Sequence, residues 1–176
     1  MKKIIGLFFA VLFSAGLYAQ EEVIKFLGIP VDGTKQEMIQ KLKSKGFTYN
    51  QREDVLEGEF NGEKVVIVVQ TQNNKVWRLA IIDKTNRSEG QIRIRFNKLV
   101  AQFENNGKYT PYEESQTIDE NEDIRYEISL HDKQYEAVFF SKTGGLVWFK
   151  IAKGVLDYNI AMFYENTNNA ADGSDL

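Results

Sequence analysis

Residues 56–82, LEGEFNGEKVVIVVQTQNNKVWRLAII, contain three strand patterns separated by two turn signals. Asn61-Gly62 is a strong hairpin signal, because both central positions of such a turn need a positive φ, which these residues tolerate. Asn73-Asn74 marks the second turn. Between the turns, residues 65–69 form a continuous β-branched run, which is typical of a strand in the middle of a sheet. The stretch therefore predicts a three-stranded antiparallel meander.

A helix is expected just before this meander. Thr34 and Glu37 have the spacing of a capping box, in which each side chain bonds the other residue's backbone amide. The apolar residues that follow share one helical face, and Gly46 supplies the left-handed residue that ends many helices. The apolar face consists of Met38, Ile39 and Leu42.

A second helix is favoured after the meander, although its sequence also fits a strand. Ser88 and Gln91 form another capping box, and Gly107 is placed to end the helix. Residues 91–96 alternate between polar and apolar, as in a strand. The full apolar pattern extends to Phe103, which is longer than a typical strand of about five or six residues. The shared helical face consists of Ile92, Phe96, Leu99, Val100 and Phe103.

The remaining sequence predicts a second group of strands. After an acidic loop (113–123), residues 124–130 alternate regularly and predict a strand with Tyr126 on its apolar side. Strands are also expected over 135–140 and 146–152, on either side of the Thr143-Gly144-Gly145 turn. The aromatic segment 158–164 is ambiguous, but its length and composition favour a strand. The polar tail, 166–176, is expected to be flexible.

The two groups resemble each other in layout, which suggests an internal repeat of residues 33–83 and 88–165. Val76-Trp77 in the first corresponds to Val147-Trp148 in the second. Tandem helix-plus-antiparallel-meander units predict an α+β fold with helices on one face of an antiparallel sheet. We expect a single globular domain over residues 20–165, with the other sheet face partly open.

The first nineteen residues have the pattern of a cleavable signal peptide. Lys2 and Lys3 precede an apolar run over 4–17, and Ala19 is a small residue suited to the cleavage site. The run is shorter than the ~20 residues of a membrane span. The chain has no cysteine, so lipoprotein anchoring is excluded. We expect an exported protein, periplasmic or secreted, with no stable membrane insertion after cleavage.

The composition argues against several classes of function. The processed chain would hold 20 basic and 25 acidic residues, whereas nucleic-acid binders have a basic excess. His131 is the only histidine, and its expected place is a solvated turn beside Asp132. A nucleophilic enzyme usually needs a histidine base, and zinc needs His or Cys ligands. The sequence therefore predicts no catalytic residue, no metal and no cofactor.

Aromatic residues are concentrated in the second half of the chain. Adjacent strand residues point to opposite faces, so helices on one face would leave some aromatics on the other. Such a patch usually marks a binding site, for which Trp148, Tyr126 and Tyr135 are the candidates. The leading hypothesis is an exported, non-enzymatic binding or interaction module for an envelope protein or a small ligand. One alternative is a glycan hydrolase with two carboxylates roughly 5–10 Å apart; another is a structural envelope component.

Two resemblances accompany this interpretation. The layout is similar to the tandem units of the β-lactamase-inhibitor-protein class, in architecture only. A second resemblance lies in the sequence of six segments: 26–34 (FLGIPVDGT), 38–43 (MIQKLK), 46–47 (GF), 95–99 (RFNKL), 102–109 (QFENNGKY) and 172–176 (DGSDL). In these segments the chain resembles a family of exported Bacteroidota proteins that has no assigned activity, so this resemblance implies a compartment and no chemistry.

Overall fold

The structure, a computed structural model, describes residues 23–114 and 116–170. The proposed signal peptide and residues 171–176 lie outside this range. Four strands precede the middle of the chain: β3 (Thr48–Asn50), β4 (Val55–Phe60), β5 (Glu63–Gln72) and β6 (Lys75–Asp83). Four follow it: β7 (Tyr109–Pro111), β8 (Glu136–Ser141), β9 (Leu146–Lys153) and β10 (Tyr158–Glu165).

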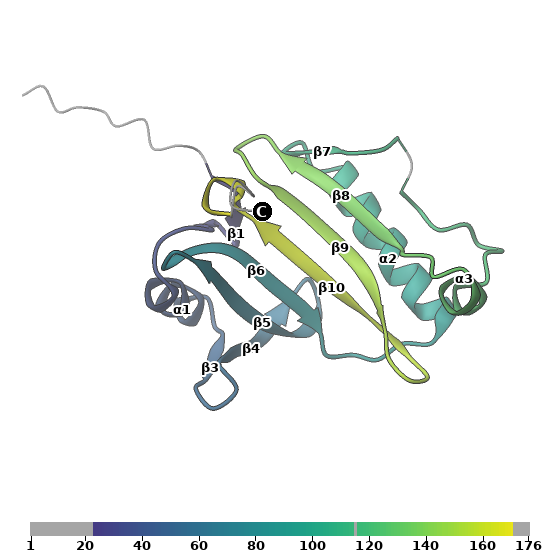
Figure 1. Ribbon diagram of the computed structural model, residues 1–176, viewed down its shortest axis with the longest axis horizontal. Helices are drawn as coiled ribbons and strands as arrows, with labels where there is room; N and C mark the ends of the chain where they lie inside the picture. The colour runs from purple at the N-terminus through teal and green to yellow at the C-terminus, as the bar shows by residue number, and fades with distance from the viewer. Residues whose placement is uncertain (1–22, 115, 171–176) are drawn as a thin grey trace, which may run out of the picture.

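These strands form one eight-stranded antiparallel sheet in the order β3-β4-β5-β6-β10-β9-β8-β7 (Figure 1). Each half of the sheet follows its own helix in the chain, α1 (Lys35–Ser44) or α2 (Glu89–Glu104). The halves meet where β6 pairs with β10. The predicted α+β fold is thereby confirmed. Val76-Trp77 lies on β6 and Val147-Trp148 on β9, so the two pairs occupy different places in their halves.

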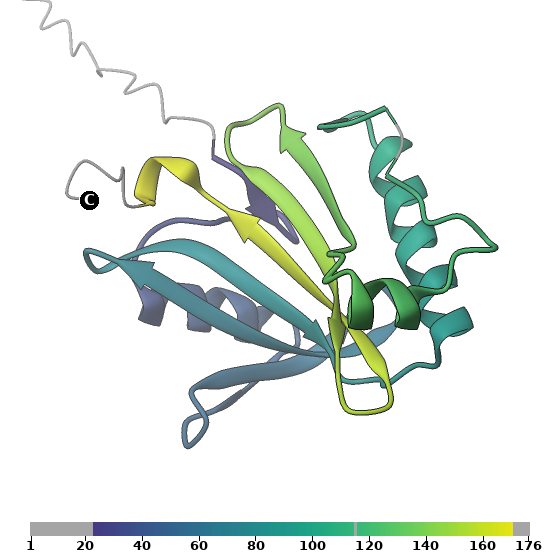
Figure 2. The same ribbon diagram turned by 45° about the vertical axis from the view of Figure 1, so that its right-hand side comes forward.

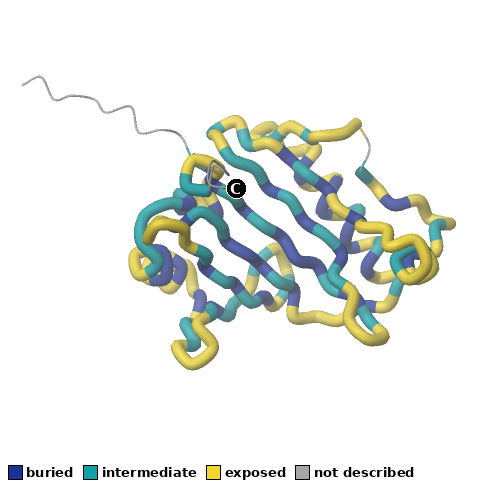
Figure 3. Tube along the Cα trace, viewed as in Figure 1, coloured by how far each residue is buried: buried dark blue, intermediate teal, exposed yellow. Residues whose placement is uncertain are grey.

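The predicted meander and its turns are confirmed. Asn61 and Gly62 have φ of 52° and 77°, and Asn73 and Asn74 have 49° and 63°. All four residues therefore adopt the left-handed conformation that their turns require. In β5 the burial alternates strictly, with Val65 and Val69 among the buried residues on one face (Figure 3).

Both long helices pack on one face of the sheet. Helix α1 has the predicted capping box at Thr34 and Glu37 and lies on β5 and β6. Helix α2 confirms the helix that was favoured over a strand for this segment. It lies on β9 and β10. Figure 1 shows α2 behind the sheet, and Figure 2 shows α1 behind β5 and β6. Their buried side chains and those of the sheet form the core: Met38, Ile39, Leu42, Ile92, Phe96, Leu99, Val100 and Phe103 are the helical contribution.

A short hairpin that the sequence reading did not predict completes this covered face. It consists of β1 (Lys25–Phe26) and β2 (Ile29–Pro30). The Phe26 side chain is fully buried, with ring centroids 4.8 Å from Phe60 and 5.1 Å from Tyr164. Phe60 belongs to β4 and Tyr164 to β10, so this one aromatic side chain contacts both halves of the sheet.

The start of the polar tail is anchored to this hairpin, which corrects the expectation of a flexible tail for residues 166–170. Asn166 is 2% exposed, and its Nδ2 donates to the Val31 carbonyl at 2.9 Å. Asn169 Nδ2 donates to Asp32 Oδ1 and to the Val76 carbonyl within a short helical turn, η1 (Thr167–Asn169). These asparagine side chains connect backbone segments that are distant in the sequence. The polar composition of the tail does not by itself predict such hydrogen bonds.

The predicted strand over 124–130 is wrong, because this segment is a helix, α3 (Ile124–Leu130) (Figure 2). Asp123 caps it by accepting from the Tyr126 amide at 2.7 Å. The Ile124 amide donates to Glu89 Oε1 of α2 at 2.8 Å. Ile124 is the helix's buried residue, so the regular apolar alternation does not correspond to a buried strand face. The local cap and the contact with α2 outweigh the strand pattern.

The close packing of Phe47 on β4 gives a stability prediction. A Cβ on Gly58 would lie 2.5 Å from the Phe47 ring, so Gly58→Ala requires the ring to move. We expect a loss of about 1–3 kcal/mol in the free energy of unfolding, the usual range for overpacking. Gly90→Ala, on α2, has no atom within 4 Å of its new Cβ and is the control. It should be neutral or gain up to about 1 kcal/mol, because alanine favours a helix over glycine. Urea unfolding measures both; equal stability of the two variants would contradict the packing described.

Candidate functional site

The sheet face opposite the helices, here called the open face, carries an apolar row that crosses five strands. Residues that are register partners on neighbouring strands project from the same face. The partners Trp148 and Phe163 continue into Ala80, giving a central row about 19 Å long at the usual strand spacing of ~4.8 Å. From β8 to β5, the central row consists of Val138, Trp148, Phe163, Ala80 and Val68.

Rows with charged and apolar residues flank the central row on both sides. The Arg78 row, from β8 to β5, consists of Phe140, Leu146, Glu165, Arg78 and Gln70. The Lys150 row, from β8 to β4, consists of Glu136, Lys150, Ala161, Ile82, Val66 and Glu57. Most of these side chains are partly exposed, and Phe140 is 45% exposed. The open face therefore combines an apolar centre with charges of both signs.

An ion pair joins the two halves of the sheet beside the central row. Arg78 Nη2 of β6 lies 2.5 Å from Glu165 Oε1 of β10, and these side chains are 24% and 12% exposed. The Trp148 indole donates from Nε1 to the same Glu165 oxygen at 2.6 Å. The Arg78 guanidinium also lies over the Trp77 ring, 3.9 Å from its centroid, in a cation–π contact. Both tryptophans of the chain thus meet at Arg78 and its carboxylate partner.

The aromatic rings of the central row stand upright on the sheet. Trp148 and Phe163 are register partners, and their rings stack with centroids 4.1 Å apart and an interplanar angle of 19°. This separation is close to the ~4.8 Å between strands, so the ring planes lie across the line that joins the two strands. Each ring covers one broad surface of the other, and their edges point outward. Such rings interdigitate with side chains; they do not form a flat platform for a sugar ring.

Unpaired polar atoms also gather on this face. Among the described residues, four side-chain nitrogen or oxygen atoms are buried without a hydrogen-bond partner. Three belong to residues of the open face: Gln70 Oε1, Arg78 Nε and Asn159 Oδ1. Nearly all buried polar atoms in folded proteins are paired, and each exception calls for an explanation. Their position marks the open face as the part of the sheet where hydrogen bonding is least complete.

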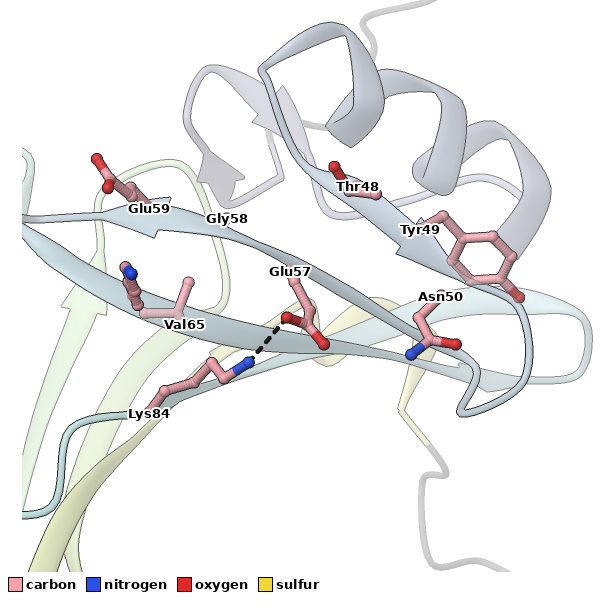
Figure 4. A pocket seen from close by; sticks show the side chains of 9 residues that line it. Thr48, Tyr49, Asn50, Glu57, Gly58, Glu59, Val65 and Lys84 are labelled. Carbon is pink, nitrogen blue, oxygen red and sulfur yellow. Dashed lines mark hydrogen bonds and ion pairs between the residues drawn. The ribbon is translucent and has the colours of Figure 1, made fainter.

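A cavity of about 570 Å³ lies at the margin of this face, beside β3, β4 and β5 (Figure 4). Strand β3 pairs with β4 only as far as Glu57, so the outer edge of β4 from Gly58 onward borders the cavity. Glu57 and Glu59 both line it. Glu57 Oε2 is 2.8 Å from Lys84 Nζ, and these two side chains are 41% and 45% exposed. The cavity thus holds two carboxylates, one of which is neutralised by a lysine, in contact with solvent.

Of the three predicted site residues, Trp148 alone lies on the open face. Tyr126 is on α3, 49% exposed, with its ring against His131. Tyr135 is buried just before β8, and its hydroxyl donates to Glu122 Oε1 at 2.7 Å. Burial and the Glu122 carboxylate raise the pKa of the Tyr135 phenol, which therefore stays protonated. The expectation that these tyrosines share a sheet face with Trp148 is wrong. Tyr126 lies on α3, which replaces the predicted strand, and Tyr135 is buried in the core directly before β8.

Sequence reasoning missed Arg78, Glu165 and Phe163. Phe163 could have been found, because it lies in a predicted strand whose alternation places it opposite the buried Met162 and Tyr164. The Arg78–Glu165 pair had no local signal, since it depends on the pairing of β6 with β10.

His131 and the other metal-ligating residue types do not assemble into a further site. His131 is 55% exposed, and its Nδ1 lies 3.1 Å from Glu127 Oε2. In the part of the chain that the structure describes, no three His, Cys, Asp or Glu side chains are grouped to hold a metal ion. No helix of that part is long and apolar enough to cross a membrane.

Comparison of the chain with known protein families, with curated proteins and with solved structures finds no match. The function is therefore inferred from the residues and their geometry.

The ion pair at the centre of the site gives a second stability prediction. Glu165→Ala leaves the Arg78 guanidinium and the Trp148 Nε1 without their shared acceptor, and both are partly buried. We expect a loss of about 1–3 kcal/mol in the free energy of unfolding, the range for an unpaired buried group. Glu57→Ala removes the exposed pair with Lys84, and exposed pairs contribute only about 0–1 kcal/mol. Urea unfolding compares the two; a Glu165→Ala loss no larger than that of Glu57→Ala would contradict the described role of Glu165.

Proposed function

We propose that this chain is an exported, non-enzymatic binding module that recognises a protein through the open face of its sheet. The observation that carries the proposal is the central row with the adjoining Arg78–Glu165 pair. These residues lie on the only large face of the sheet that no described element covers. Apolar side chains on an uncovered sheet face have no role in the core, and such patches typically mark an interaction surface.

The residue types favour a protein over a glycan. Tryptophan, tyrosine and arginine carry much of the binding energy at protein interfaces, often at their centre. Trp148, Phe163 and Arg78 occupy the centre of the open face, and charges of both signs surround them. The upright rings present edges, which pack between side chains, whereas a sugar ring stacks on an exposed aromatic surface. A protein surface with its own ridges and charges fits this arrangement best.

The energetics require a wide contact. Full burial of an exposed Val or Phe side chain contributes about 1.5–3 kcal/mol, and the side chains of the central row are already partly buried. Association itself costs an estimated 4–15 kcal/mol or more. The central row alone therefore cannot hold a partner, and the flanking rows must take part. This requirement again favours a protein partner, because a small ligand would not cover all three rows along the ~19 Å that the central row extends across the strands.

The hydrolase alternative has one supporting observation, the presence of Glu57 and Glu59 in the marginal cavity. A glycosidase acid is usually held protonated by an apolar surrounding. Glu57 instead pairs with Lys84 in an exposed position, which favours a binding role for this cavity. If the protein were instead a structural envelope component, substitutions on the open face would leave its binding to other proteins unchanged.

A matched pair of lysine substitutions tests the proposed function. Val68→Lys places a charge in the central row, while Ile94→Lys places the same residue on α2, where Ile94 is 70% exposed. Each tagged protein would be used for capture from periplasmic extract, with mass-spectrometric identification. We expect the wild type and Ile94→Lys to capture the same partner. The amount captured by Val68→Lys should be at least tenfold lower, because binding would remove water from a charged lysine side chain without replacing its hydrogen bonds.

Circular dichroism and thermal unfolding would first establish that both variants are folded. The same captured proteins, in the same amounts, with Val68→Lys and Ile94→Lys would refute binding through the open face.

A further inference from the structure

We propose that the protein recognised by the open face is a second copy of this chain, so that two sheets pack face to face in a symmetric dimer. This inference rests on the proposed function, since it names the partner of the same surface. It follows from the way large, small and charged residues are distributed between the two halves of the sheet. One half carries the bulky side chains of the central row, and the other half carries the small ones.

The proposed twofold axis lies in the open face, parallel to the strands, between β6 and β10. Rotation about this axis places β10 opposite β6 of the second copy, because these strands are neighbours at the centre of the sheet. In the same way, β9 faces β5 and β8 faces β4. The residues of each row then face the same row of the second copy in reverse order. Sheets packed in this way keep their strands within about 30° of one another and lie ~10 Å apart.

Within the central row, this rotation places large residues opposite small ones. Phe163 faces Ala80 of the second copy, and Trp148 faces Val68. Ala80 is 5% exposed although no described element covers it, because its small side chain lies below its taller neighbours. The Lys150 row reverses the order: Ile82 of the first half faces Ala161 of the second copy, which is 8% exposed for the same reason. Bulky side chains of each copy thus pack into the depressions that the alanines leave in the surface of the other copy.

The charges are also compatible with this arrangement. Arg78 faces Glu165 of the second copy, and Glu165 faces its Arg78, so the two ion pairs form one alternating group of four. Glu136 faces Glu57 of the second copy, which is the one opposition of like charge between register-paired rows. Glu57 is paired with Lys84, and the register partner of Glu136 is Lys150, whose Nζ lies 5.9 Å from the centroid of the Trp148 ring.

The face is large enough for a stable dimer. Eight strands at ~4.8 Å spacing span about 34 Å, and the longer strands extend roughly 25 Å along their length, which gives about 800 Å². A stable protein interface buries about 800 Å² on each partner. The complementarity is built from this chain's own residues, which favours a second copy over an unrelated protein.

Sedimentation velocity with the exported protein purified from the periplasm tests the inference. We expect a concentration-dependent dimer for the wild type. Ala80→Trp fills the shallow place opposite Phe163 and should weaken dimerisation at least tenfold. Ala101→Trp introduces the same side chain on the exposed side of α2 and should leave the dimer unchanged.

Val68→Lys, opposite Trp148 of the second copy, provides an independent disruption if Ala80→Trp does not fold. A wild type that remains monomeric at millimolar concentration would overturn the dimer, as would a dimer that persists in folded Ala80→Trp and Val68→Lys. Capture of a different protein through the open face, by a monomeric chain, would leave the proposed function intact while refuting this inference. A monomer that captures nothing would refute both.

Discussion

The antiparallel pairing of β6 with β10 is the contact on which the rest of the structure depends. Its register places Ile81 beside Met162 and Leu79 beside Tyr164 in the core. The alternate pairs of the same ladder, Ala80 with Phe163 and Arg78 with Glu165, form the centre of the open face. Because strand side chains alternate between faces, one ladder fixes both the core and the candidate site. A shift of register by one residue would bury Arg78 and expose Leu79, so the core enforces the geometry of the open face.

The covered face explains why the other face remains available. Helices α1 and α2 each lie on one half of the sheet, and Phe26 of the β1–β2 hairpin packs against both halves. Asn166 ties the end of β10 to the same hairpin through the Val31 carbonyl. These contacts place the two helices, the hairpin and the start of the tail on or beside one face. Apolar residues of the opposite face, such as Val66, Val68 and Ile82, are then left partly exposed.

Local signals in the sequence were sufficient for much of the fold. Asn61-Gly62 and the capping boxes act within a few residues, so the meander and both long helices could be predicted. The helix over residues 124–130 could not be predicted, because its sequence alternates regularly as a strand does. The Asp123 cap and the hydrogen bond from the Ile124 amide to Glu89 stabilise the helical form. Trp148 was accessible to prediction as a half-buried strand aromatic, whereas the Arg78–Glu165 pair depends on strands that are distant in the sequence. Tyr126 was misplaced because its segment is a helix, whereas Tyr135 was misplaced because its side chain is buried in the core directly before β8.

Site-specific photo-crosslinking in living cells tests the central claim, that the open face is an interaction surface, most directly. A photoreactive phenylalanine analogue would replace Val138, at one end of the central row, or Ile94, which is exposed on α2. The account predicts a discrete crosslinked species, to a second copy or to another protein, from position 138 and none from position 94. The same products from both positions, or crosslinks from position 94 alone, would contradict it.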